Sequence, residues 1–177
     1  MDDTSEVTTV PDAGTPARRL PLVVAAIAAV VLVLDQLTKT WAVSALTGRG
    51  PVDVVGSLLR LDLTRNSGAA FSFATGMTWI FTVVATAVAI TIVRVSRKLG
   101  SVGWSVALGL LLGGALGNLS DRLFRAPGFA VGHVVDFLEL PYWPVFNVAD
   151  SCIVSSALLI ALLGLRGIAI DGSRAGA

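Results

Sequence analysis

The stretch VVDFLELPYWPVFNVADS, residues 134–151, decides the architecture expected for this chain. It carries two aspartates, Asp136 and Asp150, joined by a short connector that contains aromatic residues and proline. Asp150 stands at the mouth of an apolar run, Ala149 to Leu165, that is long enough to enter a lipid bilayer. Carboxylates at the edge of hydrocarbon are energetically costly, so two of them at this place predict a function. The rest of the chain is expected to hold and cover this pair.

Composition identifies an integral membrane protein. Of the 177 residues, 54% are hydrophobic and only 14% are charged, whereas soluble domains contain about 25% charged residues. The formal net charge of +1 gives no basic surface for nucleic acid. Cys152 and His133 are the only cysteine and histidine, so the chain has no internal disulfide and too few nitrogen or sulfur ligands for zinc. We expect neither a metal nor a cofactor.

Four apolar runs predict four transmembrane helices around a single domain, residues 20–166. A polar head, residues 1–19, is interpreted as a disordered cytoplasmic tail, and residues 167–177 as a short cytoplasmic tail. The first run is not interpreted as a cleavable signal peptide, because no small-residue cleavage site follows it before Asp35. The expected helices are about 20–41, 77–93, 102–119 and 148–165.

Two segments lie outside these runs. Residues 42–75 contain several helix-breaking glycines, and Leu59 to Thr64 alternates apolar and polar residues with the period of a half-buried strand. We therefore expect a mainly α membrane protein with four transmembrane helices, a small extracytoplasmic β-rich element over residues 42–75, and a second extramembrane segment from Leu123 to Asn147.

Charge distribution favours cytoplasmic termini. Seven Lys and Arg residues fall on the side of the termini, three of them within the short loop from Arg94 to Lys98, against five or six on the opposite side. The two aspartates would then lie at the extracytoplasmic boundary of the membrane.

Polar residues from four separate segments map to that same face of the predicted bundle. Polar side chains at membrane depth turn toward one another or toward a watery cavity, so one convergent site is expected. Its candidate members are Asp35, Lys39, Asn66, Asn118, Asp121, Arg122, Asp136, Asn147 and Asp150.

These residues also have structural interpretations. Asn147 and Asp150 have the spacing of a capping box, which is compatible with chemistry because a helix N-terminus also stabilises an ionised carboxylate. Asp136, between Val135 and Phe137, is the hardest to explain structurally. Local pairing or a turn would account for three further groups, namely Asp35 with Lys39, Asp121 with Arg122, and Asn66–Ser67–Gly68.

Two neighbouring carboxyls permit a particular chemistry. They cannot both ionise easily, so they share a proton. The ionised group can accept a proton from water, and the protonated group can polarise a carbonyl or protonate a leaving amine. This is peptide hydrolysis without a metal or a covalent intermediate. The sequence has no GxSxG motif, and Cys152 has no evident partner base.

Five ordered blocks resemble the lipoprotein signal peptidases (type II signal peptidases), which are four-helix aspartic proteases of bacterial inner membranes. The resemblance extends from Leu20 to about Leu165, and the tail and the Ala/Val/Gly content suggest an actinobacterial member. The blocks are DQLTK (35–39), NSGAAFS (66–72), GGALGNLSDR (113–122), VVDF (134–137) and FNVADS (146–151).

The resemblance implies an activity and roles for residues. It implies cleavage of a prolipoprotein signal peptide just before a diacylglyceryl-modified cysteine, with Asp136 and Asp150 as the catalytic aspartates. The β-rich element would form a cradle and the Leu123–Asn147 segment a flap, in a monomer that contacts prolipoproteins and membrane lipids. The implied supporting residues are Asp35, Lys39, Asn66, Gly68, Asn118, Asp121, Arg122 and Asn147.

Three other functions fit the sequence less well. A protease that resembles the presenilins or the prepilin peptidases would contain a GxGD motif, which this chain lacks. A proton-coupled transporter would need polar groups on both sides of the midplane, but the inner halves of the predicted helices carry almost no charge. A structural membrane protein would leave the convergence of four polar segments unexplained.

Overall fold

The computed structural model describes residues 19–68 and 78–174. The expected tail over residues 1–19 lies almost wholly outside them, as does the Ala69–Ser72 part of the second block. Within the described residues the elements are α1 (Leu20–Leu46), β1 (Val52–Val55), β2 (Leu59–Asn66), α2 (Thr78–Ser96), α3 (Val102–Phe124), β3 (Val134–Glu139) and α4 (Val148–Leu165).

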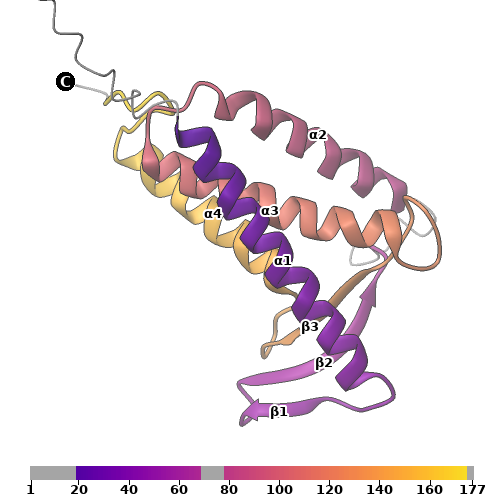
Figure 1. Ribbon diagram of the computed structural model, residues 1–177. Coiled ribbons are helices and arrows are strands. Elements are labelled where there is room, and N and C mark those ends of the chain that lie inside the picture. Colours follow the sequence, from indigo (N-terminus) through magenta and orange to yellow (C-terminus); the bar gives the residue numbers. More distant parts are fainter. Residues whose placement is uncertain (1–18, 69–77, 175–177) are drawn as a thin grey trace, which may run out of the picture.

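All four helices are long and apolar enough to cross a membrane, which confirms the expected fold class (Figure 1). At 27 residues α1 extends about 40 Å, more than the thickness of a hydrocarbon core of about 30 Å. It continues past Trp41, where the sequence predicted its end, because Ala42 and Leu46 are buried against Phe137 of β3. The membrane-spanning helix thus also forms part of the core beneath the sheet.

Helix α3 is the centre of the bundle and packs on the other three helices. Its glycines permit this close packing: a methyl group at Gly113 would collide with Val31 of α1, and one at Gly114 with Ile153 of α4. Helix α2 packs mainly on α3, and Figure 1 shows it at the edge of the bundle.

The three strands form one antiparallel sheet in the order β1–β2–β3. Strand β3 comes from the segment expected to be a flap, yet it pairs with β2 so that Asp136 lies opposite Thr64. The sheet packs against the ends of α1 and α3 (Figure 1). Residues 134–137 are all buried there, so the Asp136 carboxyl needs hydrogen-bond partners from neighbouring segments.

A small hairpin follows α4, where the sequence predicted only a short polar tail. Ile168 and Arg174 form a bridge between its two arms. The indole Nε1 of Trp104 donates a hydrogen bond of 2.9 Å to the Ile168 carbonyl, and the Gly100 amide donates one of 3.0 Å to the Ile170 carbonyl. The hairpin, residues 167–174, therefore lies against the turn between α2 and α3.

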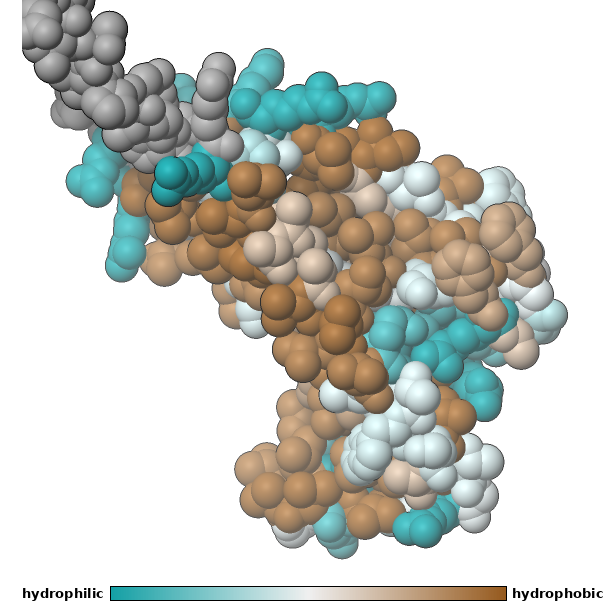
Figure 2. All heavy atoms as spheres, in the orientation of Figure 1, coloured by the Kyte–Doolittle hydropathy of each residue, from teal (hydrophilic) through white to brown (hydrophobic). Residues whose placement is uncertain are grey.

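The surface divides into bands along the bundle. Figure 2 shows apolar residues over the helices, and polar residues both at the end that carries the termini and in the angle between the helices and the sheet. This distribution fits helices embedded in lipid, with a polar region beside the sheet.

Candidate active site

Strand β3 places Asp136 at the centre of the polar region. Its side chain is 1% exposed and accepts a hydrogen bond at each oxygen. Asn66 Nδ2, on β2, donates to Oδ2 at 2.9 Å, and Asn147 Nδ2 donates to Oδ1 at 2.6 Å. Both donors come from other segments of the chain, so the orientation of this carboxyl is fixed by the tertiary fold.

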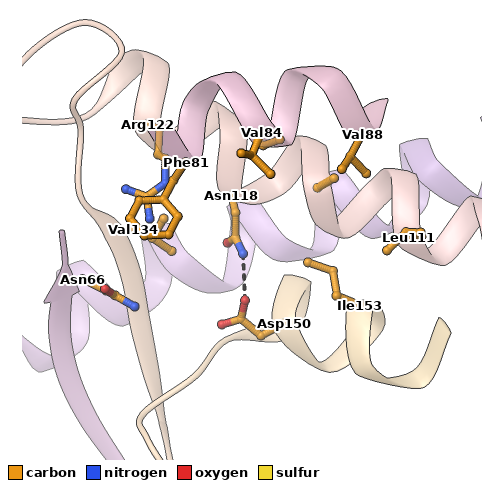
Figure 3. Close-up of a pocket in the computed structure, with 12 residues that line it drawn as sticks. Asn66, Phe81, Val84, Val88, Leu111, Asn118, Arg122, Val134, Asp150 and Ile153 are labelled. Atoms are coloured by element: carbon orange, nitrogen blue, oxygen red, sulfur yellow. Dashed lines mark hydrogen bonds between the residues drawn. The ribbon is translucent and has the colours of Figure 1, made fainter. Parts of the chain in front are cut away.

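Asp150 occupies the first turn of α4, within the expected capping box. Its amide donates to Asn147 Oδ1 at 2.8 Å, and its Oδ2 accepts from the Asn147 amide at 3.3 Å. Its Oδ1 accepts from Asn118 Nδ2 of α3 at 2.7 Å (Figure 3). Asn147 therefore contacts both aspartates, as a helix cap for Asp150 and as a side-chain donor to Asp136.

A pocket of about 310 Å³ opens beside these groups. Figure 3 shows that Asn66, Asn118, Arg122 and Asp150 line it at one end and that apolar side chains of α2, α3 and α4 continue from them. The pocket thus offers a polar end for a reaction and an apolar wall for a lipid-like group. Its apolar lining consists of Phe81, Val84, Ala85, Val88, Leu111, Ala115, Val134 and Ile153.

Beneath the aspartates lies a buried ion-pair cluster, which we define as Asp35, Lys39, Asp121 and Arg125. The ammonium group of Lys39 is 2.8 Å from Asp35 Oδ2 and 3.0 Å from Asp121 Oδ2, and all three side chains are fully buried. Arg125 Nε is 2.6 Å from Asp121 Oδ1. The cluster holds two positive and two negative charges, so its formal charges balance.

This cluster is bonded to the elements that carry the two aspartates. Asp35 Oδ1 accepts from the Ala149 amide at the start of α4, at 2.9 Å. Asp121 Oδ2 accepts from the Val135 amide, next to Asp136 in β3, at 3.0 Å. Lys39 Nζ also donates to Asn118 Oδ1 at 2.8 Å, which leaves the amide nitrogen of Asn118 directed at Asp150.

The alternative interpretation of Asp121 and Arg122 as a local charge pair is wrong, because Asp121 pairs with Lys39 and Arg125. Arg122 points instead to the pocket, with its guanidinium carbon 4.9 Å from the centre of the Phe81 ring and Nη1 3.5 Å from the Gly132 carbonyl oxygen. A cation over an aromatic face is attracted by the ring, so Phe81 fixes the position of this charge.

The turn expected at residues 66–68 is present. The Gly68 amide donates to Asn66 Oδ1 at 2.7 Å, and Gly68 has a φ of +92°, which favours glycine. The turn holds the oxygen of the Asn66 amide and leaves its nitrogen for Asp136. Gly68 thus supports the site through Asn66.

Two members of the polar region were not singled out from the sequence. The Gln36 side chain donates to the Gly117 carbonyl and to Asp121 Oδ1, each at 3.1 Å, and Arg125 binds the same carboxylate. Gln36 stands inside the first block, and Arg125 follows Asp121 by four residues, a spacing that brings side chains together on a helix. Those were the available signals.

Burial changes the acidity of Asp136. Removal from water raises the pKa of its carboxyl from 3.8 to about 6, and the nearby charge of Asp150 acts in the same direction. The hydrogen bonds from Asn66 and Asn147 and the charge of Lys39 oppose this rise in pKa. A carboxyl with a pKa near 6 exchanges protons easily close to neutral pH.

Gly117 provides a test of how closely the cluster is packed. A methyl group there would lie 2.5 Å from Asp35 Oδ2, so we expect Gly117→Ala to lower the free energy of unfolding by about 1–3 kcal/mol. Gly164→Ala, on α4, is the control, because nothing lies within 4 Å of its added methyl group. Thermal unfolding in detergent measures both; equal stability of the two variants would show that Asp35 has room to move.

Fold and site together define a multi-pass membrane protein with paired carboxyls at one end of a four-helix bundle. Comparison with known families makes the assignment specific: the family described as Signal peptidase (SPase) II matches residues 27–166. The chain therefore belongs to the signal peptidase II family of bacterial membrane proteases, as the sequence blocks predicted.

Individual proteins support this assignment. The chain is 53% identical over 175 residues to a lipoprotein signal peptidase of Rhodococcus jostii, and the alignment covers 99% of this chain and 87% of the relative. It is 50% identical over 161 residues to one of Mycobacterium tuberculosis, covering 91% and 79%. A solved structure described as a bacterial membrane enzyme, determined in meso, aligns with a TM-score of 0.71 and 30% identity over 81% of this chain and 92% of that one.

Proposed function

We propose that this protein removes the signal peptide from diacylglyceryl-modified prolipoproteins by hydrolysing the peptide bond just before the lipidated cysteine. Asp136 and Asp150 are the catalytic pair in this proposal. The observation that carries it is the position of Asn147, which hydrogen-bonds both aspartates at a pocket with one polar end and one apolar wall. A peptide bond next to a lipid chain is the substrate that such a pocket fits.

The reaction needs only water and the two carboxyls. The ionised carboxyl accepts a proton from water as the oxygen attacks the peptide carbonyl, and the protonated carboxyl stabilises the developing oxyanion. That proton then passes to the leaving amine as the carbon–nitrogen bond breaks. The carboxyl that gained a proton from water is now the protonated one and the other is ionised, so the pair again carries a single proton. No metal and no covalent intermediate takes part.

Asparagines and arginine arrange this chemistry. Asn66, Asn118 and Asn147 each donate to an aspartate oxygen and so fix the direction in which the free lone pairs point. Arg122, held over Phe81 in the pocket lining, supplies a positive charge for a carbonyl or ester oxygen of the substrate. These residues position the substrate and the carboxyls.

The site is proposed to face the extracytoplasmic side, with both termini in the cytoplasm. The support is the loop between α2 and α3, at the end of the bundle far from the sheet, which contains Arg97 and Lys98 just after Arg94. Short loops rich in lysine and arginine remain in the cytoplasm.

The test is cleavage of a purified diacylglyceryl-modified prolipoprotein by the purified protein in detergent. Mass spectrometry of the products should give a signal peptide that ends at the residue before the cysteine, with an unchanged rate in the presence of a metal chelator. The same precursor without its lipid is the control and should be cleaved far more slowly. Cleavage at another bond, or loss of activity with chelator, would refute the proposal.

The raised pKa of Asp136 predicts a pH-dependent stability. Because its folded pKa of about 6 exceeds the ordinary 3.8, protonation favours the folded state, and this stabilisation is lost as pH rises through 6. Between pH about 4 and pH about 7 the contribution is up to about 3 kcal/mol. Thermal unfolding across this range should show a shallower pH slope for Asp136→Asn than for wild type; equal slopes would refute the raised pKa.

A further inference from the structure

The pocket beside the aspartates continues along the bundle as a second, apolar hollow. This hollow of about 480 Å³ shares Val84, Val88 and Leu111 with the first pocket, and Figure 3 shows these side chains extending away from Asp150. We define the two together as the α2–α3 groove. The remaining lining of the second hollow is Ala87, Thr91, Ile92, Val95, Leu108 and Ile170.

Among the described residues that line the second hollow, Ile170 is the one that comes from outside the helices. It lies on the C-terminal hairpin, residues 167–174, and packs against the apolar core formed by α1, α2 and α3. The Gly100 amide binds its carbonyl, and the backbones of Gly100 and Asp171 are so close that a methyl group at position 100 would collide with the Asp171 carbonyl. The hairpin is therefore fixed at the end of the groove far from the aspartates.

We infer that the hairpin is the floor of the α2–α3 groove and that Ile170 limits the length of the substrate acyl chain that can be held there. This inference rests on the proposed function, which supplies the lipid. From Phe81 to Val95 the groove follows 15 residues of α2, a span of about 21 Å at the rise of a helix. Ile170 closes a channel that begins at the reactive carboxyls.

The size of the groove selects an acyl chain over a peptide helix. A helix about 10–12 Å across would occupy more than about 1,000 Å³ over such a length, whereas the two hollows that form the groove hold about 310 Å³ and about 480 Å³. The lining of the second hollow is apolar apart from Thr91, whose hydroxyl already donates to the Ala87 carbonyl. An alkyl chain has no hydrogen bonds to lose there.

A third hollow, also apolar, lies on the other side of α2, but it is not placed to hold an acyl chain of the substrate. Among the described residues its lining shares no member with the pocket that contains Asp150, and it ends at Arg94 and Arg97. A chain attached to a cysteine at the aspartates would therefore not enter it directly. Ile90 lines this hollow and provides a matched control for Ile170.

The experiment compares full-length wild type, Ile170→Ala, Ile170→Trp and Ile90→Ala on one prolipoprotein that carries lauroyl, palmitoyl, stearoyl or arachidoyl chains. The readout is the ratio of kcat/KM between successive chain lengths. The length at which this ratio falls should move to longer chains in Ile170→Ala and to shorter chains in Ile170→Trp, with a change of about tenfold at the limit. Ile90→Ala should have the wild-type profile.

A second measurement leaves the hairpin unaltered. Precursor with a photoreactive group at the end of an acyl chain is bound to the Asp136→Asn protein and irradiated. Adducts are expected on Val95, Leu108 or Ile170. Adducts on Ile90 or Val93 would overturn the inference. So would identical chain-length profiles in wild type and the Ile170 variants, provided that all of them are active. Either result would leave the proposed function intact. Failure of wild type to cleave any lipidated precursor would overturn both.

Discussion

Asp136→Asn and Asp150→Asn are each expected to lower kcat for lipidated-precursor cleavage by about a thousandfold or more. An amide cannot accept the proton from water, and it cannot supply the acidic proton that the leaving amine requires. Asparagine has nearly the same shape as aspartate, so each variant should still insert into the membrane and bind its substrate. The measurement is single-turnover cleavage in detergent, with thermal unfolding as the check of folding.

Asp53→Asn is the matched control for these variants. Asp53 lies in β1, and its side chain is 68% exposed and 3.4 Å from Arg60. A surface ion pair of this kind contributes about 0–1 kcal/mol, so both activity and stability should stay close to wild type. If Asp136→Asn or Asp150→Asn cleaved at the rate of Asp53→Asn, that aspartate would have no catalytic role.

Lys39→Met is expected to lower the free energy of unfolding by about 3–5 kcal/mol. The substitution keeps the apolar stem but removes the charge, and it leaves Asp35 and Asp121 buried with only Arg125 to balance them. Uncompensated buried charge is far more costly than the loss of an exposed pair. The midpoint temperature of thermal unfolding in detergent should fall by about 6–20 °C.

Arg60→Met separates burial from charge removal. Arg60 also stands between two carboxylates, Asp53 at 3.4 Å and Glu139 at 3.6 Å, but its side chain is 37% exposed. Its loss should change the free energy of unfolding by about 1 kcal/mol or less. Equal effects of Arg60→Met and Lys39→Met would mean that the cluster under the aspartates does not hold the fold together.

The sequence predicted the ion pair within α1 but not the contacts that join α1 to α3 in this cluster. Asp35 and Lys39 are four residues apart on a helix, so their ion pair follows from helical geometry. That Lys39 also reaches Asp121 and Asn118 depends on how closely α1 packs on α3, which the glycines of α3 permit but do not specify. The spacing of residues within one helix cannot predict how two helices are aligned against each other.

Strand β3 illustrates a second limit. An aspartate flanked by apolar residues gave no clear strand signal, and its partner strand lies about 70 residues earlier, so Asn66 and Asp136 meet only through tertiary pairing. The predicted helix ends failed for a related reason. Apolar-run criteria stop at Trp41 and Leu119, whereas α1 and α3 continue to Leu46 and Phe124. The additional turns carry residues that the tertiary fold buries: Leu46 of α1, and Asp121 and Arg122 of α3.

Capping chemistry was the most informative local signal. Asn147 and Asp150 form the expected box, and the same two side chains also reach Asp136 and Asn118. The first turn of α4 therefore combines a helix cap with one of the two proposed catalytic aspartates. The C-terminal hairpin had no comparable signal, because residues 167–174 contain glycine and charged residues and read as a tail.

The most direct test of the account is a double-mutant comparison at the two aspartates. Single-turnover cleavage of the lipidated precursor is measured for Asp136→Asn, Asp150→Asn and the double variant, each checked for folding. Two carboxyls that share one proton and one water act as a unit, so the double variant should be no more than a few-fold slower than either single variant. A double variant whose loss equals the product of the two single losses, or a single variant with wild-type activity, would contradict the shared mechanism.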